Sequence, residues 1–181
     1  MSRPLRIVLV GFMGAGKSTV GRILAERLAC PFVDLDDEVA RLAGRPIPEI
    51  FRSEGEPVFR RLEAKATARL DGLDRGVVAA GGGWMARAEL RERWSGAIRV
   101  WLKVSPAAAI ARLGCGVASR PMLDPADPER SARSLLEARE EEYGRAELWV
   151  DTEGRGPEEV VQEILSRVRR KGRVPETPEI I

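Results

Sequence analysis

Residues 11–19 read Gly11-Phe12-Met13-Gly14-Ala15-Gly16-Lys17-Ser18-Thr19, which fits the phosphate-loop pattern G-x-x-x-x-G-K-[ST]. The run follows a short β-branched stretch, residues 5–10, that suits a buried parallel strand. Downstream, apolar residues recur at helical spacing at positions 20, 23, 24 and 28. The alternative is a glycine-rich turn with a surface lysine. Because strand, glycine loop and helix come in the required order, we predict a nucleoside triphosphate site.

The chemistry of phosphate binding explains the residue types in this loop. Glycines lack a Cβ, so the backbone can fold closely around a phosphate, with its N–H groups pointing at the oxygens at the positive end of a helix. We expect Lys17 to contact the β- and γ-phosphates and Ser18 to ligate Mg²⁺. The predicted nucleotide-binding residues of the loop are Gly14, Ala15, Gly16, Lys17, Ser18 and Thr19.

Length and composition describe a globular chain. The 181 residues, 44% hydrophobic and 32% charged, suit one domain with a substantial core. No apolar run is long enough for a membrane span, and the chain enters its first strand without a targeting segment, so we expect a cytoplasmic protein. The net charge is only +2 and the arginines are dispersed, which argues against a nucleic-acid partner. We expect a monomer.

The histidine and cysteine content limits which residues can act as catalytic groups. The chain has no histidine, so a catalytic base must be a carboxylate, a lysine or water. The two cysteines, Cys30 and Cys115, are far apart in the sequence and are expected to be reduced structural thiols.

Short apolar strands alternate with helical stretches, a pattern typical of a parallel sheet covered by helices on both faces. The expected strands cover residues 5–10, 32–35, 77–80, 98–104 and 148–150. The expected helices follow the phosphate loop and lie near residues 37–43, 48–53, 56–70, from 106, 128–146 and 157–171. We predict a single domain over 1–171, a mobile loop over about 113–127 and a flexible tail at 172–181.

Two carboxylates follow the second expected strand. Alternation along a strand end would place Asp34 and Asp36 on one side, at the edge where open α/β sheets bind ligands. One carboxylate can hold Mg²⁺ through water, and the other can accept a proton from a hydroxyl that attacks the γ-phosphate. The alternative is a helix N-cap, because Asp36 and Asp37 precede a helical stretch.

Two arginines stand on expected helices with different surroundings. Arg60 has Glu63 three positions on and Glu56 four positions back, which would preorganise its guanidinium for a carboxylate or simply form an exposed ion-pair ladder. Arg139 shares the apolar side of its helix with Tyr143, and no local carboxylate faces it. Its partner is either a bound anion or a carboxylate from elsewhere in the fold.

The last two motifs are a glycine run and a loop arginine. Gly81-Gly82-Gly83 directly follows a strand and permits close approach of a ligand, with a tight turn as the plainer alternative. Arg120 lies in the irregular segment, where it either swings over a transferring phosphate or is a solvated loop residue.

Together these motifs resemble the shikimate kinase family. The corresponding stretches are the phosphate loop, Asp34-Leu35-Asp36, Gly55-Glu56 followed by Phe59-Arg60-Arg61-Leu62-Glu63, Gly81-Gly82-Gly83, Arg120-Pro121-Met122-Leu123, and Arg139 with Tyr143. The match covers residues 5–170 in the right order and spacing. The phosphate loop is generic, whereas the other motifs taken together are far more specific.

The resemblance implies an α/β fold of the P-loop nucleoside-monophosphate-kinase type. That fold is a three-layer sandwich with a five-stranded parallel sheet and a mobile lid, here over about 113–127, with a shikimate-binding region over about 34–62. It also implies transfer of the ATP γ-phosphate to the 3-hydroxyl of shikimate, giving shikimate 3-phosphate in the chorismate route to aromatic amino acids.

Carried over by position, the resemblance assigns site residues. Asp36 would bind the shikimate hydroxyls and act as the candidate base. Arg60, Gly82 and Arg139 would complete the shikimate site, with the two arginines clamping the carboxylate.

The nucleotide side follows in the same way. Ser18 would ligate Mg²⁺ directly and Asp34 through water, while Lys17 and Arg120 would stabilise charge on the moving phosphoryl group. The adenine-side residues implied by the resemblance are Arg112 and Arg155.

The chain departs from the family pattern at two points near the triple glycine. Ala79-Ala80 stands where a hydroxyl residue is common, and Trp84 is bulkier than expected and is predicted to narrow the site. Two other functions fit part of this pattern. A related small-molecule kinase, such as a gluconate kinase, would lack the paired arginines beside Asp36, and a non-catalytic nucleotide-binding module would lack Asp36, Arg60 or Arg120.

Overall fold

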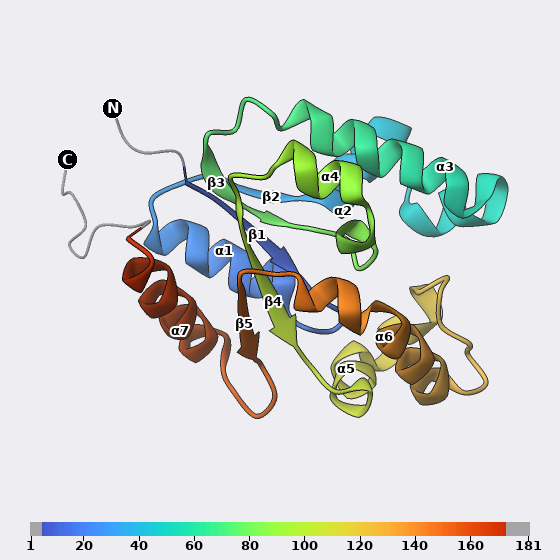
Figure 1. The fold of residues 1–181 in the computed structure, drawn as a ribbon. Coiled ribbons are helices and arrows are strands. Elements are labelled where there is room, and N and C mark those ends of the chain that lie inside the picture. The colour runs from blue at the N-terminus through green and yellow to red at the C-terminus, as the bar shows by residue number, and fades with distance from the viewer. Residues whose placement is uncertain (1–4, 173–181) are drawn as a thin grey trace.

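A five-stranded parallel sheet forms the centre of the protein, which is described here from a computed structural model covering residues 5–172 (Figure 1). The strand order is β2-β3-β1-β4-β5, and all four pairings are parallel. The strands are β1 (Leu5–Val10), β2 (Phe32–Asp34), β3 (Arg75–Ala79), β4 (Ile98–Lys103) and β5 (Leu148–Asp151). The predicted parallel sheet is confirmed.

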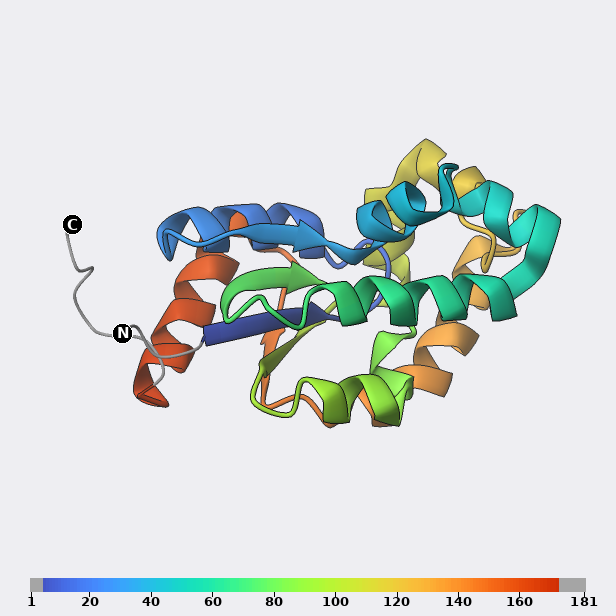
Figure 2. The ribbon, with the colours of Figure 1, turned by 90° about the horizontal axis from the view of Figure 1, so that it is seen from above.

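Helices cover both faces of this sheet, as the alternating sequence pattern predicts. They are α1 (Lys17–Arg27), α2 (Leu35–Ala43), α3 (Ile47–Arg69), α4 (Ala88–Arg93), α5 (Pro106–Leu113), α6 (Pro128–Gly144) and α7 (Pro157–Arg170), with 3₁₀ turns at Trp84–Ala86 and Gly114–Ser119. Helices α1 and α7 lie on one face, whereas α3 and α4 lie on the other (Figure 2).

Alternation along β1 explains the two cores. Ile7 and Leu9 pack with residues of α1 and α7, while Val8 and Val10 pack with residues of α3 and α4. All four side chains are fully buried. A strand with both faces covered reads as a continuous apolar run, and the run at residues 5–10 has this form.

The carboxyl ends of the parallel strands meet at one edge of the sheet, and the remaining elements stand beyond that edge. Figure 2 shows α2, the start of α3, α5 and α6 gathered there, past the arrowheads of the strands. The crevice outside this edge is the usual ligand site of an open α/β sheet.

The region between β2 and β3 agrees with the prediction except at the end of β2. Strand β2 ends at Asp34 and α2 begins at Leu35, so the predicted strand through residue 35 is wrong at its end. The two helical pieces expected around 48–53 and 56–70 are both present within α3, which is broken into two helices at Gly55, where φ is 76° and ψ is 178°. A positive φ of this size favours glycine, and Pro57 follows without a backbone donor.

Two short elements have no counterpart among the predicted ones. The 3₁₀ turn at 84–86 and α4 carry few residues, but they bury Trp84, Met85, Leu90 and Trp94 against α3 and the sheet. The segment 114–127, predicted to be irregular, begins with a 3₁₀ turn. The predicted flexible tail falls on residues that, apart from Gly172, lie outside the described range.

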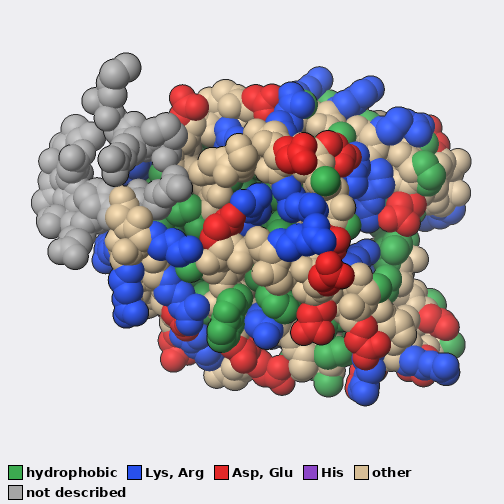
Figure 3. Space-filling model, viewed as in Figure 1, with side chains coloured by type: hydrophobic (Ala, Val, Ile, Leu, Met, Phe, Trp, Pro, Cys, Tyr) green, Lys and Arg blue, Asp and Glu red, His purple; other side chains and the backbone are tan. Residues whose placement is uncertain are grey.

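The surface is mixed in charge. On the face seen in Figure 3, Lys and Arg side chains alternate with Asp and Glu and do not merge into one basic tract. Within residues 5–172, no helix combines the length and apolar character needed to cross a membrane.

Candidate active site

One cavity of about 520 Å³ opens at the carboxyl edge of the sheet. Every site residue predicted from the sequence lines it. These residues are Gly14, Ala15, Gly16, Lys17, Ser18, Thr19, Asp34, Asp36, Arg60, Gly82, Arg112, Arg120, Arg139 and Arg155. Residues that are far apart in the sequence, from Gly14 to Arg155, therefore line the same cavity.

The phosphate loop is formed by glycines at positive φ. Gly14 and Gly16 have φ values of 75° and 86°, and α1 begins at the next residue, Lys17. Lys17 Nζ donates to the carbonyls of Gly11 and Phe12, each at 2.9 Å. The ammonium is therefore held across the mouth of the loop at the N-terminus of α1, where anions bind.

The Lys17 ammonium has an unusual environment for a lysine. Burial lowers its pKa to about 8, and the nearby Asp36 and Asp34 carboxylates only partly oppose that shift. The positive charge is therefore poorly compensated by the protein, which favours an anionic ligand.

This shift predicts proton uptake on nucleotide binding. Since the Lys17 pKa is about 8, the amine loses its proton as the pH rises through 8, and a bound polyphosphate restores it. Calorimetry of ADP binding in two buffers of different ionisation enthalpy should show uptake that grows as the pH rises through 8 and vanishes well below it. Lys17→Met is the control. Equal uptake in that variant would contradict the assignment.

Ser18, Asp34 and Asp36 form a connected group beside the loop. Ser18 Oγ donates to Asp34 Oδ2 at 2.5 Å, and the backbone N–H of Asp36 donates to Asp34 Oδ1 at 3.0 Å. Asp34 is the N-cap of α2. The two carboxylates are neighbours because Asp36 lies in the first turn of a helix, not because of strand alternation, and the residue that caps the helix is Asp34.

The Asp36 carboxylate is enclosed by the cavity wall. Burial and the neighbouring Asp34 charge raise its pKa, against the opposing charges of Lys17 and Arg120. A raised pKa makes a carboxylate a better proton acceptor.

Arg120 is exposed in the segment after the 3₁₀ turn, yet its charge reaches both Lys17 and Asp36.

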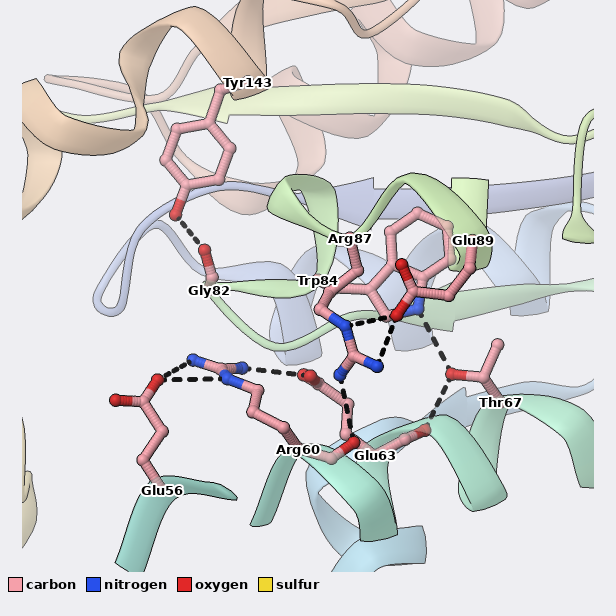
Figure 4. Close-up of polar contacts among 9 residues, drawn as sticks. All are labelled: Glu56, Arg60, Glu63, Thr67, Gly82, Trp84, Arg87, Glu89 and Tyr143. Atoms are coloured by element: carbon pink, nitrogen blue, oxygen red, sulfur yellow. Dashed lines mark hydrogen bonds and ion pairs between the residues drawn. The ribbon is translucent and has the colours of Figure 1, made fainter. Parts of the chain in front are cut away.

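Arg60 is held by two carboxylates of its own helix, as the spacing predicted (Figure 4). Its Nε and Nη2 donate to Glu56 Oε1 at 3.1 and 2.8 Å, and its Nη1 donates to Glu63 Oε2 at 2.9 Å. Glu63 is only 1% exposed, so this ion pair is not a surface ladder. Three of the five guanidinium N–H groups are used, which leaves two for a ligand.

Arg139 has a different setting. Within residues 5–172 it forms no ion pair. Its Nη1 lies 2.9 Å from where a Cβ on Gly82 would stand, and the hydroxyl of Tyr143, one helical turn on, lies 3.5 Å from the same point. The carboxylate partner left open by the sequence is therefore absent from the described part of the chain.

The triple glycine makes room for charged side chains. A Cβ on Gly81 would lie 2.6 Å from Glu63 Oε1, and one on Gly83 would lie 2.7 Å from Arg60 Cζ. Real Cβ atoms do not come so close, so any other residue would displace Glu63 or Arg60. None of the three glycines has a positive φ. The run does form a turn, in which the Trp84 N–H donates to the Gly81 carbonyl at 3.0 Å, but the glycines are needed there for space and not for a positive φ.

The two adenine-side arginines are tied to the protein. Arg112 Nη1 donates to Thr152 Oγ1 at 2.9 Å and to the carbonyl of Gly14 at 3.3 Å. Arg155 pairs with Glu163 of α7 and donates to the carbonyl of Asp151. Thr152, which fixes Arg112, has no recognisable sequence signal.

Trp84 does not narrow the cavity, contrary to the prediction. It is fully buried in the core formed with α3 and α4, and its Nε1 donates to Thr67 Oγ1 at 3.2 Å. Thr67 Oγ1 donates in turn to the carbonyl of Glu63 at 2.9 Å. Trp84 therefore supports the turn of α3 that carries Glu63 (Figure 4).

The sheet order, the phosphate loop and the converging charged groups define an ATP-dependent kinase of the P-loop class. The profile of the shikimate kinase family matches residues 13–169, and the chain belongs to that family.

Individual relatives agree with this assignment. A shikimate kinase of Streptomyces avermitilis is 44% identical over 167 residues, covering 92% of this chain and 96% of the relative. The solved structure of a shikimate kinase from Acinetobacter baumannii in complex with shikimate superposes with a TM-score of 0.87 at 36% identity, covering 92% and 94% of the two chains. A gluconokinase from Sinorhizobium meliloti, covering 94% and 95%, reaches a TM-score of 0.63 at 24% identity and shares the fold alone. The comparisons favour shikimate kinase over gluconate kinase.

Proposed function

We propose that the protein transfers the γ-phosphoryl group of ATP to the 3-hydroxyl of shikimate, giving shikimate 3-phosphate and ADP. One observation carries the choice of acceptor. Arg60, Arg139 and Asp36 all lie beside the triple glycine, in the cavity that also contains the phosphate loop. Two guanidinium groups suit a small carboxylic acid, and a carboxylate in the same cavity suits its hydroxyls.

The two arginines contribute differently to binding of the acid. Glu56 and Glu63 neutralise Arg60, whereas the Arg139 charge has no carboxylate partner within residues 5–172. We therefore assign most of the electrostatic attraction for the acid to Arg139. Arg60 provides oriented donors, since its fork is fixed from two sides.

The residues beside the loop fit Mg²⁺. This ion prefers oxygen ligands and commonly takes one or two protein groups plus substrate phosphates. Ser18 Oγ and Asp34 Oδ2 lie 2.5 Å apart next to the loop. Residues 5–172 contain no cluster of three acidic or thiol ligands, here or elsewhere, so water and phosphate oxygens would complete the coordination. Ser18 would hold the ion directly and Asp34 through water, and the ion would neutralise charge on the phosphates.

Asp36 and two cations act on the reacting atoms. Asp36 orients the acceptor hydroxyl and takes its proton as the oxygen–phosphorus bond forms, while the bond from phosphorus to the ADP oxygen breaks. Lys17 and Arg120 stabilise the charge on the moving phosphoryl group. We propose that the segment carrying Arg120, residues 113–127, closes over the nucleotide as a lid.

All proposed site groups belong to one chain, so a monomer suffices for activity. ATP as co-substrate fits the cytoplasmic location expected from the sequence.

The test is a coupled assay of ADP release with shikimate and gluconate in parallel, with phosphorus NMR of the product. Turnover with shikimate but not gluconate is expected. If shikimate gives no ADP above the blank that contains only ATP, the proposed acceptor is wrong.

Arg139→Ala should weaken shikimate binding about 10- to 100-fold, the usual loss for a hydrogen-bonded charged partner. The dissociation constant for ADP should stay unchanged, because the phosphate loop is not altered. Arg133→Ala is the matched control, since Arg133 is exposed on the same helix and pairs with Glu129. Calorimetric titration measures both constants, and an unchanged affinity for shikimate would rule out the role given to Arg139.

A further inference from the structure

The phenol of Tyr143 contacts the glycine run directly. Its hydroxyl donates to the carbonyl of Gly82 at 2.6 Å, across 61 residues of sequence (Figure 4). Tyr143 is fully buried, and its ring packs against Trp101 with centroids 5.7 Å apart. Because the Tyr143 side chain is fully buried, its hydroxyl has no water as an alternative partner, so this bond holds the phenol against the half-buried Gly82.

The Gly82 carbonyl belongs to the peptide unit that also contains the N–H of Gly83. A peptide is planar, so holding the oxygen fixes the direction of that N–H. Within residues 5–172, the N–H groups of Gly82 and Gly83 have no protein acceptor. The phenol therefore orients a backbone donor that the protein itself does not use.

The same phenol lies beside Arg139. Arg139 Nη1 and the Tyr143 hydroxyl stand 2.9 and 3.5 Å from the point where a Cβ on Gly82 would lie, and the Arg139 charge opposes the rise in the phenol pKa that burial causes. Arg139 and Tyr143 are one turn apart on α6. Arg139 and the phenol therefore meet at Gly82, whose carbonyl accepts the hydrogen bond from the phenol.

We infer that Tyr143 is a positioning residue that aligns Arg139 and the Gly82–Gly83 peptide as one unit for the carboxylate of the acceptor. This inference rests on the proposed function. Tyr143 touches neither reacting atom, so its effect is on the binding of the acid and not on the nucleotide.

Tyr143→Phe tests the inference, since it keeps the ring and removes the hydroxyl. A second link between the same elements remains, because Arg91 of α4 donates to the carbonyl of Met85 and pairs with Glu142 of α6 at 3.3 Å. The dissociation constant and KM for shikimate should rise roughly three- to tenfold, the range for one lost hydrogen bond, with KM for ATP unchanged. Trp101→Phe loosens the packing around Tyr143 but keeps the phenol, so it should raise the dissociation constant and KM for shikimate less.

Two outcomes would overturn the inference. One is a Tyr143→Phe enzyme with wild-type affinity for shikimate, and the other is an equal loss of affinity for shikimate and ATP. If the wild-type enzyme neither binds nor phosphorylates shikimate, the proposed function fails and the inference falls with it. If the wild-type enzyme phosphorylates shikimate and Tyr143→Phe binds it equally well, only the role given to Tyr143 is wrong.

A spectroscopic readout covers the case in which the variant does not fold. Tyr143 is the only tyrosine of the chain, so a ¹³Cζ-tyrosine label gives one assigned resonance. Saturating shikimate should shift that resonance in the wild-type protein, and ADP alone should not. A resonance unmoved by bound shikimate would overturn the inference.

Discussion

Asp36→Asn should lower kcat by about 10²- to 10⁴-fold, the range for loss of a positioned general base. The amide can still accept a hydrogen bond from the acceptor hydroxyl, but it cannot take the proton. ADP should bind with unchanged affinity, because the phosphate loop and the Ser18–Asp34 contact are intact. Stopped-flow turnover and calorimetric ADP binding measure the two quantities separately.

The neighbouring carboxylate supplies a matched control. Asp37 is exposed in the same turn of α2, so Asp37→Asn changes the charge without touching the cavity and should leave kcat near wild type. Because burial raises the Asp36 pKa, wild-type activity should fall as the pH drops through that pKa, where the carboxylate gains a proton. Near-normal turnover of Asp36→Asn would remove this residue from the mechanism.

Arg120→Ala should lower kcat about 10³-fold, at the lower end of what an arginine supplies to phosphoryl transfer. Its charge already reaches Lys17 and Asp36, although the side chain is exposed. The expected loss is in kcat, because the charge on the phosphoryl group is greatest in the transition state. Affinity for shikimate should change little.

Arg130→Ala is the comparison variant, since Arg130 is an exposed arginine at the start of α6 outside the cavity. Single-turnover kinetics with saturating substrates separates the chemical step from release of products. If Arg120→Ala keeps the wild-type single-turnover rate, the arginine does not act on the phosphoryl group.

Local chemistry explains what could be predicted from the sequence. The phosphate loop needs glycines at positive φ, and Gly14 and Gly16 have them. The contacts of Arg60 with Glu56 and Glu63 follow from helical spacing, so they too were predictable.

Contacts that depend on tertiary packing could not be predicted from the sequence. The bond from Tyr143 to Gly82 joins segments 61 residues apart, and no periodicity points to it. Trp84 was expected in the cavity, but whether it faces the cavity or the core depends on Thr67 of α3, which accepts its indole N–H. The orientation of Asp36 was derived from a strand that ends two residues earlier.

The crowding around Gly81 and Gly83 limits how this enzyme can be made more heat-resistant. Replacing glycine by alanine often raises thermostability by restricting the unfolded chain, by about 0.4–1 kcal/mol at suitable sites. Here an added methyl group would collide with Glu63 or Arg60. Protein engineers should therefore leave these positions alone and introduce alanine at Gly72 or Gly96, where a methyl group meets no neighbour and φ is not positive.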